Sequence, residues 1–141
     1  MFFASIFKIN YNKMINKINT TAAFFGLTAI ILGAFGAHAL KNSLTISQLA
    51  TFEIGVKYQM YHALFLLFVG VNNLLSIQTK KMIFILIFTG VLLFSGSIYL
   101  LATKYLTSLN IKPIGILTPI GGVFLIAGWG LFFVKSIKNK S

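Results

Sequence analysis

Four uninterrupted apolar stretches fill most of this 141-residue chain. Each has about the 20 residues that a helix needs to cross a bilayer, and Lys, Asp and Glu are absent from all of them. A helix closes its backbone hydrogen bonds internally, so such a stretch can cross hydrocarbon. The stretches are Thr20 to Leu40, Tyr58 to Ile77, Met82 to Ala102 and Ile114 to Val134. They predict an all-α fold, an integral membrane four-helix bundle.

The composition excludes a soluble domain. Charged residues make up 9% of the chain, whereas they make up about a quarter of a soluble protein. We expect a four-span membrane domain at residues 20–135, a basic N-terminal extension at 1–19 and a basic C-terminal tail at 136–141. Residues 1–13 are expected to be disordered or to lie on the membrane surface, and Met14 is an alternative start. The absence of cysteine excludes disulfides and thiolate ligands.

The net charge of +11 comes from lysines that are scattered in small groups at the ends of the apolar stretches. Arginine, which reads guanine with two hydrogen bonds, is absent, so the charge indicates a lipid bilayer as the partner and not nucleic acid. With a cytoplasmic N-terminus, eight lysines fall inside (8, 13, 17, 80, 81, 135, 138 and 140) and four outside (41, 57, 104 and 112). The positive-inside rule therefore predicts that both termini are cytoplasmic.

The segment before the second apolar stretch has a helix-start signature. Thr45 to Gln48 matches a capping box, in which the Thr and Gln side chains each bond an unpaired backbone N–H. An amphipathic pattern follows, and Glu53 precedes Lys57 by four residues, the favourable order for a helical ion pair. We expect a short extramembrane amphipathic helix that either lies on the surface or continues into the second span. For Glu53 the favoured interpretation is a solvated pair with Lys57.

Small residues mark two expected helix contacts. Ala29, Gly33 and Ala37 are four residues apart, so they form a stripe on one helix face that lets a neighbouring backbone approach. Gly121 and Gly122 are expected to do the same in the fourth span. That span has two possible starts: Ile114, with a kink at Pro119, or Pro119 itself, with Thr118 as the cap.

Polar residues of the four spans gather at one expected depth, toward the outer surface. A polar side chain inside a membrane needs a partner, so these residues are predicted to bond one another in the bundle. We expect His38 and His62 to face one outward cavity. The candidate cluster is His38, Tyr58, Gln59, Tyr61, His62, Ser95, Ser97, Tyr99 and Thr118.

Short phrases in each span carry a family resemblance. They are GAFGAHAL (33–40), YQMYHAL (58–64), LFSGSIY (93–99) and LTPIGGV (117–123), followed by Gly128 and Trp129. With one motif per helix in order, the chain resembles the family catalogued as domain of unknown function 423, relatives of the animal transmembrane protein 256. The resemblance implies a four-span plasma-membrane protein, usually bacterial. It implies no activity and no catalytic residues.

Three functional classes fit these features. A structural or accessory membrane protein is favoured, with the polar cluster as interhelical glue and a homo-oligomer or a membrane protein as a possible partner. The alternative is binding or transport of a small molecule, an ion or a lipid through an outward-facing cavity. An enzyme is the least favoured, because two histidines without an intramembrane carboxylate leave a metal or a serine nucleophile short of partners. We predict no cofactor, no metal and no catalytic residue.

Overall fold

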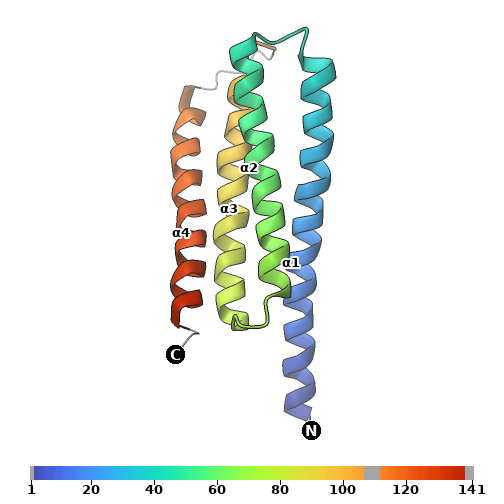
Figure 1. Ribbon diagram of the computed structural model, residues 1–141, viewed down its shortest axis with the longest axis vertical. Helices are drawn as coiled ribbons and strands as arrows, with labels where there is room; N and C mark the ends of the chain where they lie inside the picture. Colours follow the sequence, from blue (N-terminus) through green and yellow to red (C-terminus); the bar gives the residue numbers. More distant parts are fainter. Residues whose placement is uncertain (1, 107–111, 139–141) are drawn as a thin grey trace.

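The computed structural model describes residues 2–106 and 112–138, which form an all-α bundle (Figure 1). Four helices are long and apolar enough to cross a membrane, which confirms the predicted four-span architecture. They are α1 (Phe2–Phe35), α2 (Ile46–Val71), α3 (Ile77–Ala102) and α4 (Leu117–Lys138). The short helices are the π-helix η1 (Gly36–Leu40), which continues α1, and the 3-10 helices η2 (Lys104–Leu106) and η3 (Lys112–Ile116).

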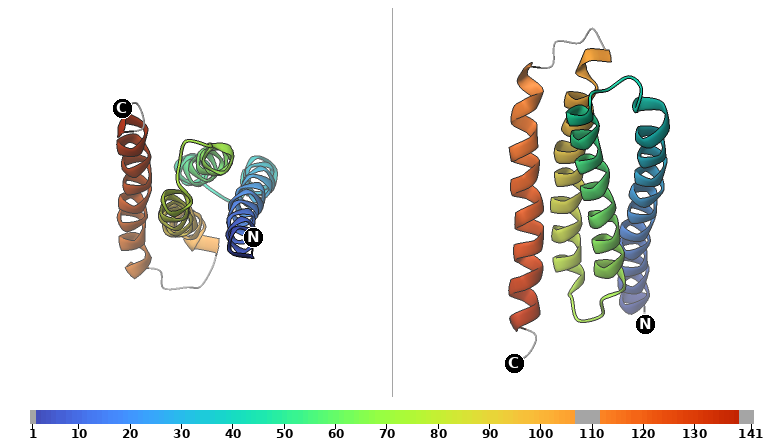
Figure 2. Two further views of the ribbon diagram at one scale, coloured as in Figure 1. Left: turned by 90° about the horizontal axis from the view of Figure 1, so that it is seen from below. Right: turned by 45° about the horizontal axis from the view of Figure 1, so that its top comes forward.

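The helices follow one another across the bundle, and successive helices run in opposite directions (Figure 1). The chief packed pairs are α1 with α2, α2 with α3 and α3 with α4. In the part of the chain that the structure describes, α3 is the only long helix whose backbone comes close to that of α4, and Figure 2 shows α4 to one side of the other three helices. Over their described residues, no Cα atom of α2 lies within 8 Å of a Cα atom of α4. Because successive helices alternate in direction, α2 and α4 run the same way. Their backbones are not in contact, and the space between them forms a groove.

The first helix is longer than expected. It begins at Phe2 and projects past the other three helices (Figure 1), so residues 2–13 are helical and not disordered. The physical reason is the absence of a helix breaker, since this segment contains neither Gly nor Pro.

The second helix shows the predicted capping box. The backbone N–H of Gln48 donates to Oγ1 of Thr45 at 3.3 Å, and the Thr45 N–H donates to Oε1 of Gln48 at 2.9 Å. From there α2 runs unbroken through the bundle, so the amphipathic segment continues into the span. The expected exposed pair is present, with 3.7 Å between Nζ of Lys57 and Oε2 of Glu53.

The same helix ends earlier than the apolar stretch does. Asn72 is its C-cap, and Oδ1 of Asn72 accepts from the backbone N–H of Leu74 at 2.9 Å to form a turn. Ser76 then caps α3 by accepting from the Thr79 N–H at 3.2 Å. The second span is thus Ile46–Val71 and not Tyr58 to Ile77, because polar side chains that satisfy backbone groups end the helix within the apolar run.

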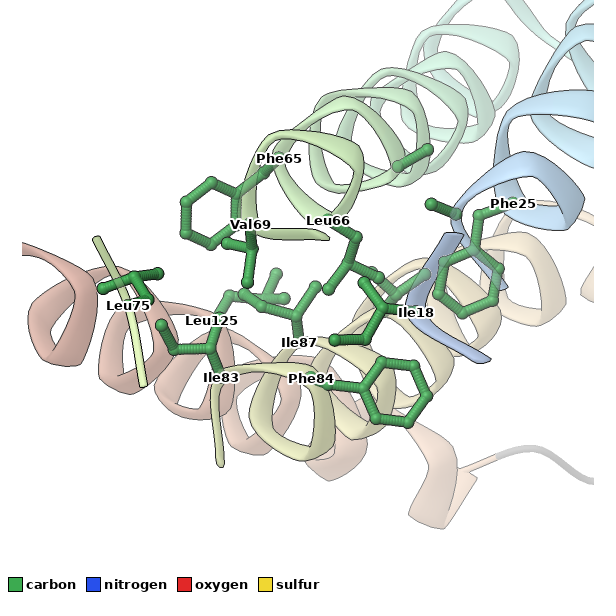
Figure 3. Close-up of a cluster of buried hydrophobic side chains, with 13 residues drawn as sticks. Ile18, Phe25, Phe65, Leu66, Val69, Leu75, Ile83, Phe84, Ile87 and Leu125 are labelled. Atoms are coloured by element: carbon green, nitrogen blue, oxygen red, sulfur yellow. The ribbon is translucent and has the colours of Figure 1, made fainter. Parts of the chain in front are cut away.

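The core is built from all four helices (Figure 3). On α1 the buried residues alternate between steps of four and three, the spacing of a left-handed coiled-coil seam. They are Ile18, Ala22, Phe25 and Ala29, continued by Gly36 and Leu40 in η1. Figure 3 shows Ile18 of α1 beside Leu66 of α2 and Phe84 of α3.

The expected small-residue stripe on α1 holds only in part. Ala29 is fully buried, and a Cβ at Gly33 would lie 3.3 Å from Cγ1 of Val56 on α2. Ala37 is exposed, and Gly36 is the residue that packs on Phe52. The placement of Ala37 in the contact is therefore wrong. Residues four apart drift by about 40° around a helix of 3.6 residues per turn, so a strict four-residue stripe leaves the contact after two steps.

Glycines bring α4 against α3. A Cβ at Gly121 would overlap the backbone of Leu93 and Phe94, and a Cβ at Gly128 would lie 2.6 Å from Cδ1 of Ile87. Gly122 does not make such a contact, because its nearest neighbours are atoms of the Phe94 ring at 3.8 Å. Close backbone approach of this kind is how membrane helices gain packing energy without a hydrophobic driving force between them.

The fourth helix starts at neither predicted residue. It begins at Leu117, directly after η3. Pro119 lies in the first turn, where backbone N–H groups have no partner within an α-helix, so it neither kinks α4 nor starts it. Thr118 is not the cap, because it is already within the helix and its hydroxyl bonds another helix.

Candidate functional site

The predicted polar cluster divides into separate groups. His38 lies exposed in η1, at the end of the bundle that carries the α1–α2 connection. His62 is buried on α2, 16 residues past Ile46 and therefore about 24 Å along the helix from its start. The expectation that the two histidines share one cavity is wrong. The cause is the true start of α2, which moves His62 from the end of the span to its interior.

One group joins α1, α2 and α3. Nε2 of the buried Gln59 donates to the backbone oxygen of Phe25 at 2.9 Å and to Oγ1 of Thr28 at 2.7 Å. The hydroxyl of Tyr99 donates to Oε1 of Gln59 at 2.9 Å. The amide nitrogen of Gln59 thus bonds α1 and its carbonyl oxygen bonds α3, and these bonds can hold the three helices in register.

A second group joins α3 and α4. The hydroxyls of Ser97 and Thr118 lie 2.6 Å apart, and Ser97 also donates to the backbone oxygen of Phe94 at 3.0 Å. Ser95 is equally buried, but its hydroxyl has no hydrogen-bond partner among the described residues. Ser97 and Thr118 therefore act between helices, whereas Ser95 contributes no such bond.

The third group surrounds His62. Its Nδ1 lies 2.7 Å from the backbone oxygen of Tyr58, and Nε1 of Trp129 on α4 donates to its Nε2 at 3.3 Å. A carbonyl can only accept and an indole N–H can only donate. Both bonds form together only when the imidazole is neutral, with its proton on Nδ1 and a lone pair on Nε2. The fold thus fixes one tautomer of His62 and directs a hydrogen-bond acceptor at α4.

A groove of about 900 Å³ lies between α2 and α4, on the side where no backbone bridges them. Its walls are mostly aromatic and aliphatic, and among the described residues none that lines it carries a charge. Exposed apolar side chains, such as Ile126 and Phe133, border it. The lining residues are Tyr58, Tyr61, His62, Phe94, Gly122, Leu125, Ile126, Trp129, Gly130 and Phe133.

The groove is open for two reasons. Glycines of α4 face it, and Trp129 packs between α4 and α2 at its inner wall. A Cβ at Gly130 would meet no atom within 4 Å, so this position leaves space that a side chain would occupy. Trp129 stacks on Phe65 of α2, with 3.8 Å between the ring centroids. At the other end the Tyr58 ring packs on that of Phe94, with centroids 4.7 Å apart. We call this site the α2–α4 groove.

The groove is lined mainly by apolar side chains, with few polar groups. Within the described ranges, no three His, Asp or Glu side chains come close enough to hold a metal ion. What the groove offers is a long apolar surface, two tyrosine hydroxyls and the Nε2 atom of His62. That combination fits a molecule with a hydrocarbon part and a small polar group.

Sequence reasoning found only part of this site. Tyr58, Tyr61 and His62 were predicted and do line the groove, whereas Gln59, Ser97, Tyr99 and Thr118 bond other helices. Trp129, which contacts His62, was missed as a site residue. A signal was present, because α2 and α4 run in the same direction and residues at similar distances from the two helix starts lie at similar depths. Comparing the depths of His62 and Trp129 in this way requires the start of the second span, which was expected at Tyr58.

Comparison with known proteins places the chain in a family. The model of a family described as a protein of unknown function, DUF423, matches residues 32–122. A UPF0382 membrane protein of Staphylococcus saprophyticus is 40% identical over 116 residues, which cover 82% of this chain and 92% of the relative. The UPF0382 membrane protein YwdK of Bacillus subtilis is 39% identical over 118 residues, covering 82% and 92%.

A more distant relative extends the range of organisms. The UPF0382 inner membrane protein YgdD of Escherichia coli is 34% identical over 124 residues, covering 84% of this chain and 88% of the relative. No solved structure matches the chain. The family match covers more than half of the sequence, and the alignments to relatives named as membrane proteins cover 88% to 92% of those relatives. The four-span chain described here is therefore an integral membrane protein that belongs to the DUF423 family.

Proposed function

We propose that this protein binds an amphiphile with a hydrocarbon chain, taken from the bilayer, in the α2–α4 groove. The observation that carries the proposal is the groove itself: about 900 Å³ of uncharged space beside the membrane-exposed surface of the bundle. Along α4 it extends from Gly122 to Phe133, about 16 Å of helix axis. A hydrocarbon chain suits such a space, because it stays in apolar surroundings when it moves from the bilayer to the groove and makes packing contacts there.

The polar groups of the groove give such a ligand an orientation. Tyr58, Tyr61 and His62 are neighbours on α2, and they are the residues of the lining with hydrogen-bonding atoms besides the Trp129 indole. A headgroup would bond on this side while its chain lies along Ile126 and Phe133. Few polar groups in an apolar cleft are the usual composition of a binding site for a small molecule.

A purely structural role is the second candidate, and a specific observation favours it. The Gln59–Tyr99 and Ser97–Thr118 bonds satisfy their own polar groups between helices and leave nothing for a ligand. They explain the part of the polar cluster that lies outside the groove. They do not explain a space that a side chain at Gly130 would fill.

The test is to fill the groove without disturbing the fold. Gly130→Leu places a side chain in the α2–α4 groove, and Gly96→Leu is a matched control, because a Cβ at either position meets no atom within 4 Å and Gly96 does not line the groove. Purified protein in lipid nanodiscs would be labelled with a photoreactive fatty-chain probe, and the labelled peptides would be mapped by mass spectrometry.

We expect the wild type and Gly96→Leu to be labelled on Ile126 to Phe133 and Gly130→Leu to lose that labelling. Labelling spread evenly over all exposed helix faces, unchanged in Gly130→Leu, would contradict ligand binding and would leave the structural role. A melting measurement on the three proteins shows whether each variant is folded.

We further propose that the membrane is the bacterial plasma membrane and that both chain termini face the cytoplasm. The support is the lysine distribution, eight on the proposed inner side and four on the outer side. Residues 1–19 and 136–141 then lie at the cytoplasmic end. Alkaline phosphatase fused after Ser141 should be inactive, and a fluorescent protein fused there should be fluorescent. The reverse result would invert the orientation of the α2–α4 groove.

A further inference from the structure

We propose that the groove selects a neutral amphiphile whose headgroup donates a hydrogen bond, a long-chain alcohol, and that Nε2 of His62 accepts that bond. This inference rests on the proposed binding function and adds the chemical class of the ligand. It follows from the tautomer of His62, from the weakness of the Trp129 bond and from the absence of charge in the lining.

The tautomer decides what the headgroup must offer. The Nδ1 proton of His62 is held by the Tyr58 carbonyl at 2.7 Å, an i to i−4 contact within α2 that a ligand in the groove does not disturb. Nε2 therefore presents a lone pair and no proton. An alcohol O–H can donate to it. An ether, an ester or a ketone cannot, because each offers only acceptors.

The bond that now occupies Nε2 is replaceable. Trp129 Nε1 donates to Nε2 at 3.3 Å, a long hydrogen bond, and O–H donors approach an acceptor more closely than N–H donors do. Trp129 is held in place independently by its stack on Phe65. Trp129 as a whole residue is 47% exposed and lines the groove, so a ligand in the groove can reach its ring.

Charge excludes the common alternatives. Across the described residues, the lining contains neither Lys nor Glu, so a carboxylate, a phosphate or an ammonium buried there would lack a counter-ion. The cost of burying an unpaired charge far exceeds the gain from a single hydrogen bond. An ordinary phospholipid can place an acyl chain in the groove, but its ester oxygens cannot donate to His62.

The experiment measures a preference, which does not depend on how much total ligand binds. Two diazirine-bearing probes of the same chain length, hexadecanol and its methyl ether, would compete for the protein in nanodiscs, and the label on groove peptides would be quantified. For the wild type we expect the alcohol to be favoured about fivefold, the effect of one neutral hydrogen bond.

Three variants assign that preference. His62→Phe should reduce the ratio to about one, Trp129→Phe should raise it because the competing donor is gone while the stacked ring remains, and His38→Phe should leave it unchanged because His38 is exposed outside the groove. If His62→Phe does not fold, Trp129→Phe decides alone, since an unchanged or lower ratio contradicts the proposal.

The outcomes separate the two proposals. Equal labelling of the groove by alcohol and ether in the wild type, or a preference that persists in folded His62→Phe, would overturn the alcohol class and leave amphiphile binding intact. Labelling that is insensitive to Gly130→Leu with both probes would overturn the binding function itself.

Discussion

The ring of Trp129 on α4 lies nearly parallel to the ring of Phe65 on α2, with an angle of 14° between the planes and 3.8 Å between the centroids. Over the described residues of the two helices, no Cα atom of α2 lies within 8 Å of a Cα atom of α4. This stack, together with the bond from Trp129 to His62, therefore bridges α2 and α4 through side chains. Phe132 adds an edge contact to Phe65, with centroids 5.5 Å apart.

Replacing Trp129 should loosen α4 from α2. Trp129→Ala removes both the stack and the hydrogen bond. We expect it to lower the free energy of unfolding by about 1 kcal/mol or more, because an aromatic pair contributes about 0.5–1.5 kcal/mol. Trp129→Phe keeps a stacked ring and should cost less. Thermal unfolding in a mild detergent measures both. Equal melting temperatures for the alanine variant and the wild type would show that α3 alone holds α4.

The contact between α3 and α4 should be sensitive to one glycine and tolerant at its neighbour. In Gly121→Ala the new methyl group meets the backbone of Phe94, which cannot move without shifting α3. We expect a loss of about 1–3 kcal/mol, the usual cost of overpacking. Gly122→Ala adds the same methyl group at 3.8 Å from the Phe94 ring, an ordinary contact distance, and is the matched control.

The comparison of the two alanine variants uses the same detergent-melting assay, with circular dichroism to follow helix content. Should Gly122→Ala be the more damaging of the two, the assignment of the helix contact to Gly121 would be in error.

The Gln59–Tyr99 bond should appear as a coupling between α2 and α3. Tyr99→Phe removes the donor to Oε1 of Gln59, Gln59→Leu removes the acceptor, and the double variant loses a bond that each single variant has already lost. Double-mutant cycles in membrane proteins give about 0.6 kcal/mol for such bonds, with a maximum of about 1.7. We expect a coupling in that range, measured from unfolding free energies. Strict additivity would mean that the 2.9 Å contact contributes nothing.

Much of the fold could be predicted because the signals were local. Four apolar runs without charge specify four spans, and the reciprocal bonds of Thr45 and Gln48 could be recognised from only four residues of sequence. The end of α2 was harder, since hydropathy continues past Asn72 to Leu74 and Leu75. There the local hydrogen-bonding capacity of Asn72 and Ser76 decided the boundary, which a hydropathy pattern does not measure.

The site was less predictable because it depends on the relative depth of helices far apart in the sequence. The expected second span began at Tyr58, 12 residues after the start of α2 at Ile46. His62 was therefore expected about 18 Å nearer the end of the span than it lies and was paired in expectation with His38. The bond to Trp129 joins residues 67 positions apart and depends on α4 being displaced from α2. Neither fact leaves a trace in local sequence patterns.

Two lysines that are adjacent in the sequence, Lys80 and Lys81, differ in how deeply the structure buries them. Lys80 is fully buried, and its Nζ donates to the backbone oxygen of Gly70 at 2.8 Å, near the C-terminal end of α2. The same ammonium lies 5.7 Å from the centroid of the Tyr11 ring on α1. Lys81 is exposed. Lys80 thus joins three helices and places a positive charge at the negative end of the α2 dipole.

We therefore expect Lys80→Met to be strongly destabilising and Lys81→Met to be nearly silent. Methionine fills a similar volume but leaves the Gly70 carbonyl without its partner, and hydrogen bonds to charged groups contribute about 1.5–3 kcal/mol. Both variants remove one lysine from the same segment, so they change net charge and the positive-inside signal equally. A difference between them in detergent melting then reports the buried contacts of Lys80. If the two variants melt together, the bond from Lys80, in the first turn of α3, to Gly70 does not stabilise the bundle.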